Sequence, residues 1–300
     1  MKRSGFRPLA AVGLVAVTLL AGASSLRAEV IEMSLYRRTG LAPIVIWGEI
    51  TDGEHRYAQV RTLELFKCSA PPCPEENFRI AYKLDSFLRK PWEDKITFQD
   101  GERLVLFLRK FTKDDGQMPE GDLYTLMWGA KGRHELPAEG EKATVDAVRA
   151  FQAILEEDDF DDQERMILEA LASPNPILAE TAFSEATEQG LGSLDLLDEL
   201  TGYFEGNRDT IRIGAMRLMG RILEDSRTAG RWPVPQVAEL RDLIRGRAAL
   251  DPSEPMRVEA VKVLAILGGD DAKAFLERLA KEDASQMVRY EAERVLIGWR

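Results

Sequence analysis

The order of hydrophobic and polar positions divides the chain into a strand-like first part and a helix-like second part. Short apolar runs separated by turn signals predict strands over 42–51, 57–67, 78–82 and 123–128, and a hairpin over 96–108. The turn of that hairpin is Asp100-Gly101, and the run 104–108 is apolar on both faces, as in a central strand. These strands, with no long helix between them, predict a small antiparallel β-barrel or sandwich over 29–132.

The hydrophobic period changes from two to about 3.6 after a polar linker at 133–143. Val145, Val148 and Phe151 fall on one helix face, and Thr144 is the expected N-cap. A second helix is predicted near 166–171. The chain is therefore expected to be α+β and multidomain, with an α-helical region over 144–300.

One pattern recurs within the helical region. Residues 251–260 and 283–292 share the form Asp-(Pro/Ala)-Ser-(Glu/Gln)-x-(Met/Val)-Arg-x-Glu-Ala. A looser Arg-x-x-Ala core, with Arg212, Arg257 and Arg289, extends the repeat backward, and Ala179/Ala182 fits it without the arginine. A repeat of this period predicts a solenoid of stacked helical units. The predicted units are a degenerate helix pair at 144–173, then 176–205, 208–250, 254–282 and 286–298.

These motifs resemble HEAT repeats, specifically the short type found in phycobilisome lyase-like proteins, over about 176–298. The resemblance implies one right-handed superhelix that binds partners on a concave face formed by the second helices. It also implies structural roles for Arg212, Arg257, Arg289, Asp251 and Asp283, with each aspartate capping a helix and each arginine tying a turn to a neighbouring unit. Read from the residues alone, the arginines also fit a basic ladder for anions.

The order of the predicted strands carries a second resemblance. A strand ending in Gly48-Glu49, a turn, a cysteine loop and the run Phe98-x-x-Gly-Glu-Arg-x-x-x-Phe107-Leu108 resemble the OB-like barrel of the netrin and tissue-inhibitor-of-metalloproteinase superfamily. In that superfamily the inhibitors chelate the target's metal through an N-terminal cysteine. Neither candidate mature N-terminus, Ser24 or Glu29, is a cysteine. Metalloprotease inhibition is therefore not expected.

The first 28 residues have the pattern of a secretory signal peptide. Lys2, Arg3 and Arg7 precede an apolar run over 9–20 and then small residues, with cleavage after Ala23 or Ala28. The alternative is an uncleaved anchor, but the run is shorter than the ~20 residues that a bilayer requires. The predicted location is periplasmic or secreted, without a stable membrane anchor.

Export makes an already acidic chain more acidic. The formal net charge is −11, and removal of 1–28 takes away four basic and no acidic residues, which leaves about −15. A chain of this charge repels nucleic acid and anionic lipid surfaces, and it favours basic partners or cations. The helical repeats make proteins the expected partners. The apolar fraction of 45% allows a sizeable core.

The two cysteines, Cys68 and Cys73, lie close together in a proline-rich loop. In an exported chain, an even number of cysteines at short spacing predicts a disulfide. The alternative is a metal or redox pair, although the spacing is not Cys-x-x-Cys.

Few other residues suggest chemistry. The acidic run 156–162 is either a calcium loop, for which the required glycine is missing, or a turn in which Asp161 or Asp162 caps the next helix. His55 and His134 have no evident partner in the sequence, and no nucleophile or phosphate-loop motif occurs. No cofactor or metal is expected.

Arg231 and Trp232 lie in an apparent loop insertion at 226–235. Because arginine and tryptophan are frequent at interface hot spots, both are candidate partner-binding residues. The alternative is that Trp232 packs against the solenoid. The sequence thus favours an exported, non-enzymatic scaffold that binds proteins through helical repeats. An accessory enzyme, a lyase-like protein and an inhibitor-like barrel are the alternatives, and the oligomeric state is open.

Overall fold

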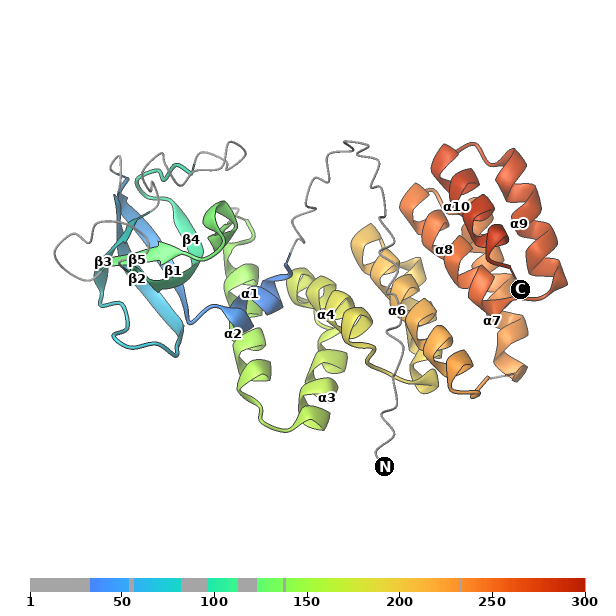
Figure 1. Ribbon diagram of the computed structural model, residues 1–300, viewed down its shortest axis with the longest axis horizontal. Coiled ribbons are helices and arrows are strands. Elements are labelled where there is room, and N and C mark those ends of the chain that lie inside the picture. The colour runs from blue at the N-terminus through green and yellow to red at the C-terminus, as the bar shows by residue number, and fades with distance from the viewer. Residues whose placement is uncertain are drawn as a thin grey trace, which may run out of the picture. The chain divides into compact units, whose positions relative to one another are not determined.

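A computed structural model describes residues 33–53, 57–81, 96–112, 123–136, 139–232 and 234–299 (Figure 1). The predicted signal peptide and His55 lie outside the described residues. Residues 33–300 form one compact unit in which a short helix precedes the strands and the other helices follow them. No helix in the described ranges is long and apolar enough to cross a membrane.

The strands close into a barrel. The bounds are β1 Ile44–Asp52, β2 Tyr57–Cys68, β3 Asn77–Ala81, β4 Arg103–Lys110, β5 Leu123–Leu126 and β6 Arg133–Glu135. Pairing runs β1-β2-β3-β5-β4, and β4 also pairs with β1, so five strands form a closed ring. All pairs are antiparallel except β3 and β5, which run parallel. The predicted small barrel is confirmed.

Strand β4, which the sequence predicts to be apolar on both faces, is buried on both faces because each face belongs to a different core. In β4, Leu104, Leu106 and Leu108 fill the barrel interior. The alternating residues Val105 and Phe107 belong instead to the core that the barrel shares with the helices. Successive residues of a strand point to opposite faces, so one strand contributes to both cores.

Two local predictions in this half differ from the structure. The expected linker at 133–143 begins with β6, which pairs antiparallel with β4, and its other end lies in a helix that starts at Glu141. Because the side chains of β6 are polar, the hydrophobic pattern does not predict this short edge strand. In the predicted hairpin at 96–108, residues 96–99 are not a strand; the chain turns at 100–101 and enters β4 at Arg103.

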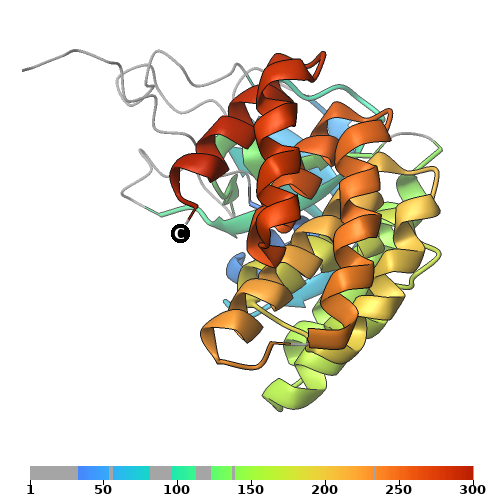
Figure 2. The same ribbon diagram turned by 90° about the vertical axis from the view of Figure 1, so that its right-hand side faces the viewer.

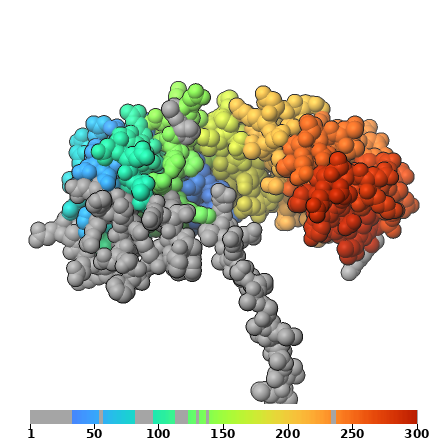
Figure 3. Space-filling model, turned by 90° about the horizontal axis from the view of Figure 1, so that it is seen from above, coloured from blue at the N-terminus to red at the C-terminus, as the bar shows by residue number. Residues whose placement is uncertain are grey.

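The helices follow in pairs. Their bounds are α2 Glu141–Glu156, α3 Phe160–Ala170, α4 Pro176–Gln189, α5 Leu197–Gly202, α6 Asp209–Thr228, α7 Val234–Leu250, α8 Glu254–Leu267, α9 Asp270–Glu282 and α10 Gln286–Ile297. The first helices of successive units pack in chain order, α4 on α6, α6 on α8 and α8 on α10. Figures 2 and 3 show this order as a continuous run of colour from green to red.

The predicted insertion at 226–235 is helical at both of its ends. Helix α6 continues to Thr228 and α7 begins at Val234, so the connection is much shorter than expected. The extra residues of the long repeat therefore lengthen two helices. The small and charged residues near 226–230 resemble a loop in sequence but also permit an exposed helix end.

Two predicted caps also differ from the structure. Thr144 is buried inside α2, where its hydroxyl donates to the Gly140 backbone oxygen (3.2 Å), and Gly140 is the N-cap. Asp159 caps α3 by accepting from the backbone of Asp161 and Asp162, which are themselves in the first turn.

A short helix before the barrel connects it to the repeats. Helix α1, Leu35–Leu41, packs on α2 and α4. The Ser34 hydroxyl donates to buried Glu185 of α4, and Arg37 forms ion pairs with Glu185 and Glu188. Tyr36 packs edge-on against Phe151 of α2, with ring centroids 5.7 Å apart. The barrel and the repeats thus share one hydrophobic core, which starts at α1.

Candidate binding groove on the helical repeats

The repeated arginines and aspartates form a ladder between consecutive units. Arg212 of α6 pairs with Asp251, which precedes α8. Arg257 of α8 lies 3.5 Å from Asp283, which precedes α10, and donates to the Asp251 backbone oxygen at 2.9 Å. Each arginine thus reaches the turn that begins the next unit, and Arg257 also holds the turn that begins its own.

Arg289 in α10 repeats one of these two contacts. Arg289 donates to the Asp283 backbone oxygen at 2.6 Å, as Arg257 does to Asp251. Asp251 and Asp283 are not the helix N-caps that the sequence predicted. Each accepts from the backbone N–H of the serine two residues later, Ser253 (3.0 Å) or Ser285 (2.7 Å), and these serines are the N-caps. The side chains of Asp251 and Asp283 therefore stabilise the turns that precede α8 and α10.

A groove of about 960 Å³ runs across the first helices of successive repeat units. Its walls come from the end of α4 and from α6, α8 and α10, together with residues after α8 and after α10. The resemblance to HEAT repeats implied a partner-binding face on the second helices. This groove is on the first helices instead.

The groove has a row of cations at one repeated position. Arg217, Lys262 and Arg294 each follow the ladder arginine of their unit by five residues. Arg221 and Arg227 of α6 add two more positive charges, whereas Glu224 and Glu259 are the acidic residues among the described lining residues. The lining is therefore positive in a chain whose formal net charge is −11.

Buried glutamates hold part of this row in place. Glu259 is only 7% exposed and accepts from Arg217 Nε at 2.9 Å and from Lys262 Nζ at 3.1 Å. In the next unit Glu291, equally buried, accepts from Arg294 Nε at 2.9 Å. Arg294 also donates to Glu291 through Nη2, and the two hydrogen bonds raise the pKa of Arg294, so its guanidinium stays charged. One glutamate thus fixes the side chains of two cations across two helices.

The cations retain capacity for a ligand. Arg217 contacts Glu259 through Nε, and Arg221 contacts Asp225 through Nε at 2.9 Å. Within the described ranges, neither arginine has a hydrogen-bond partner on its two Nη nitrogens. Between the cations, the groove has apolar side chains that include Val263, Ile266 and Trp299. A groove of this kind can bind a chain with anionic groups and small apolar side chains.

The predicted partner-binding pair occupies a different place. Trp232 is half-buried and packs against the shared hydrophobic core, while Arg231 is exposed. Neither residue lines the groove on the first helices. The structure therefore brings Trp232 into the fold and leaves Arg231 at the surface, and partner contact at this pair stays a prediction.

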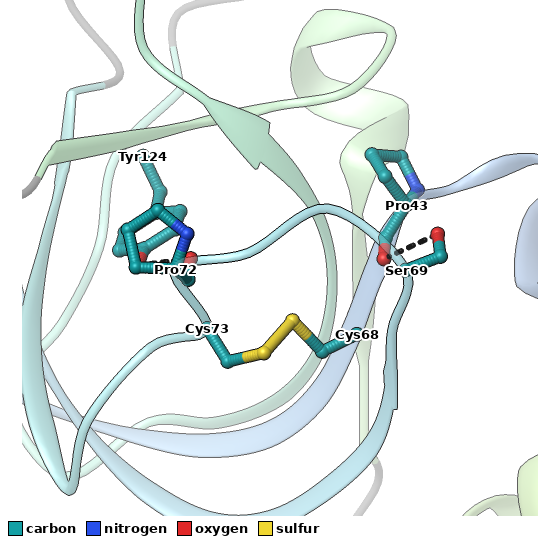
Figure 4. The surroundings of a disulfide bond; sticks show 6 residues. All are labelled: Pro43, Cys68, Ser69, Pro72, Cys73 and Tyr124. Carbon is teal, nitrogen blue, oxygen red and sulfur yellow. Dashed lines mark hydrogen bonds between the residues drawn. A yellow bond between two sulfur atoms is a disulfide. The ribbon is translucent and has the colours of Figure 1, made fainter.

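The cysteines form a disulfide within the barrel domain (Figure 4). The bridge closes the loop between β2 and β3, which is held at two further points. Ser69 donates to the Pro43 oxygen through its backbone N–H (2.8 Å) and its hydroxyl (3.1 Å), and the Tyr124 hydroxyl donates to the Pro72 oxygen (3.0 Å). The loop is therefore part of the barrel wall.

The remaining candidate residues do not converge on one site. The acidic run 156–162 covers the end of α2, the turn at 157–159 and the first turn of α3. In β6, His134 Nδ1 lies 3.3 Å from Arg38 Nη2. Burial lowers the pKa of His134, and the charge of Arg38 lowers it further to a smaller extent. Within the described ranges, no group of three or more histidine, cysteine, aspartate or glutamate side chains lies close enough together to hold a metal.

Sequence reasoning located the repeats but missed the groove. The available signal was a lysine or arginine five positions after each repeated arginine, at 217, 262 and 294. Charges on helices are common, so this signal becomes specific only when the stacking order is known. Residues 226–297 match the family model of HEAT repeats, which agrees with the stacked pairs from α7 to α10. No curated protein matches the chain.

Proposed function

We propose that this protein is an exported, non-enzymatic scaffold that holds a partner protein in the groove on its first helices. HEAT repeats commonly act as protein-interaction surfaces, and the groove across α4, α6, α8 and α10 is the observation that carries the proposal. The pattern of residues 1–28 supports export, and so does the Cys68–Cys73 disulfide, because disulfides persist in oxidising compartments.

We further propose that the barrel is of the OB type and acts as a support for the repeats. A closed five-stranded ring with one parallel pair, β3 with β5, supports that type. The netrin and tissue-inhibitor resemblance adds no inhibitory role, because both cysteines of the chain are used in the disulfide. The spacing of 32 residues between the last two units supports the short repeat type of lyase-like proteins, without their activity.

A steric block tests the proposed function independently of charge. The chain has no free cysteine, so Lys262→Cys can be labelled with a bulky maleimide under conditions that leave the disulfide intact. Glu259 keeps Arg217 as its partner in this variant. The matched control is labelled Lys273→Cys, on the exposed side of α9.

Both proteins are used to capture partners from periplasmic and secreted extracts, and captured proteins are identified by mass spectrometry. We expect the Lys273 conjugate to retain a specific partner and the Lys262 conjugate to lose it. Equal capture by both conjugates would place the binding surface elsewhere. Turnover of an extract component by the unlabelled chain would favour the alternative of an accessory enzyme.

A further inference from the structure

We infer that the groove takes an extended, acidic peptide segment whose carboxylates are spaced three residues apart. This inference rests on the proposed function, since it specifies the partner of the same groove. It goes further by naming the chemistry and the spacing of the ligand.

Charge complementarity gives the chemistry. Five of the described lining side chains are cationic, against two acidic lining residues and two acidic partners of these cations, Asp225 and Glu291, so the groove keeps a small positive excess. One of the two acidic lining residues, Glu259, is already neutralised by Arg217 and Lys262. The planar guanidinium groups of Arg217 and Arg221, with their Nη nitrogens unpaired in the described part of the chain, match the geometry of carboxylates.

The repeat gives the spacing. Arg217, Lys262 and Arg294 occupy the same position in α6, α8 and α10, which pack in that order. Packed helix axes lie about 8–10 Å apart. A chain in the extended polyproline II conformation advances about 3.1 Å per residue with three residues per turn, so three residues span about 9 Å and bring side chains at i, i+3 and i+6 to one face. Carboxylates at positions i, i+3 and i+6 would therefore meet the three cations in turn.

The groove favours a peptide over a nucleic acid or a lipid surface. A long polyanion would also meet the rest of this acidic chain, whose formal net charge is −11. A short segment interacts only with the positive strip and avoids most of that repulsion. The side chains of Val263 and Ile266 offer apolar contact between the cations, which suits small apolar residues between the carboxylates.

The test uses the full chain and synthetic peptides of nine residues. One peptide has glutamates at positions 2, 5 and 8 in a Thr/Val background, a second has the same residues with the three glutamates adjacent, and a third has glutamine in the middle position. Affinity is measured by fluorescence anisotropy at two salt concentrations. We expect the spaced peptide to bind best and to weaken as salt increases.

A double-mutant cycle locates the middle carboxylate. Lys262→Gln leaves Glu259 paired with Arg217, so the fold is preserved. Replacing the middle glutamate should weaken binding to the wild type by about three- to fivefold, as expected for an exposed ion pair. The same replacement should have little effect on the Lys262→Gln variant. Lys273→Gln, on exposed α9, is the matched control and should behave as the wild type.

Several results would overturn the inference. They are equal binding of spaced and adjacent glutamates, no coupling at Lys262, or tighter binding of single-stranded DNA or anionic vesicles than of the spaced peptide. Self-association that Lys262→Gln abolishes would show that the occupant is a second copy, through its acidic turn at 156–162. If the Lys262 conjugate blocks capture but the glutamine variant does not, the scaffold function stands and only the acidic ligand fails.

Discussion

Arg212 and Asp251 lie 39 residues apart and form an ion pair that is almost completely removed from solvent, with exposed fractions of 7% and 4%. Arg212 also donates to the Phe204 backbone oxygen at 3.2 Å and to Asp209 at 2.9 Å. Asp251 in turn accepts from the Ser253 backbone. The pair therefore connects the turn before α6, the body of α6 and the turn before α8.

The first prediction concerns this pair. Asp251→Ala removes the buried carboxylate of Arg212, which keeps only the exposed Asp209, and should reduce the free energy of unfolding by about 3 kcal/mol. Asp162→Ala is the control, because the Asp162–Arg165 pair is about half exposed on both sides and should contribute less than about 1 kcal/mol. Urea denaturation followed by circular dichroism measures both. Equal losses for the two variants would show that the buried pair has no special role.

Two glycines on helices of the repeats give a second, opposed pair of predictions. A Cβ at Gly214 in α6 would lie 2.8 Å from the Phe183 Cβ of α4, so the two helices would have to separate. Gly214→Ala should therefore destabilise the protein by about 1–3 kcal/mol, despite the better helix propensity of alanine. At Gly246 in α7, by contrast, a Cβ meets nothing within 4 Å. Gly246→Ala should stabilise by about 0.5–1 kcal/mol.

Thermal unfolding of the two glycine variants beside the wild type checks both signs at once. A stabilised Gly214→Ala would mean that α4 and α6 pack less closely than the structure has them. A destabilised Gly246→Ala would mean that α7 has a neighbour at that position. Because the substitution is chemically identical at both sites, general effects of alanine cancel in the comparison.

Much of this architecture could be predicted from sequence because it depends on local patterns. The strand pattern and the turn at Asp100-Gly101 indicated the barrel, and the recurring Arg-x-x-Ala core indicated a region of HEAT-like helical repeats. What could not be predicted depends on contacts between distant segments. Val105 and Phe107 of β4 read only as apolar, and nothing in the sequence indicates that helices cover them.

The groove was missed for a similar reason. Lys262 resembles any solvated lysine on a helix until Glu259 is known to be buried and shared with Arg217 from the preceding unit. Trp232 is a partner-binding candidate in the sequence because it falls in a predicted loop insertion. It does lie between α6 and α7, but this connection is short and the Trp232 side chain packs against the core.

Trp232 therefore carries a third prediction. Since its side chain is half-buried against the core, Trp232→Ala should lower the free energy of unfolding by about 1–2 kcal/mol through lost apolar burial. Arg231→Ala, at the exposed neighbour, should change it by less than about 0.5 kcal/mol. Denaturation and partner capture are measured on the same preparations. An unchanged stability with a loss of capture at Trp232 would support the partner-binding interpretation of the sequence.

The last prediction is a pH dependence at the junction of the barrel and α1. Burial, and to a smaller extent Arg38, lowers the pKa of His134 in the folded protein below the ordinary value of about 6.5, whereas nearby Glu135 acts in the opposite direction. Above pH 7 this histidine is neutral in both states, so its contribution to stability is fully present. As the pH falls below about 6.5, the unfolded chain binds a proton that the folded chain resists, and stability decreases. His134→Gln removes this titration, so its melting temperature should fall less than that of the wild type between pH 7.5 and 5.5. Carboxylates titrate in both proteins, so their effect cancels in the difference between the two melting temperatures. Parallel pH profiles of the two proteins would show that His134 is protonated as easily in the folded protein as in the unfolded chain.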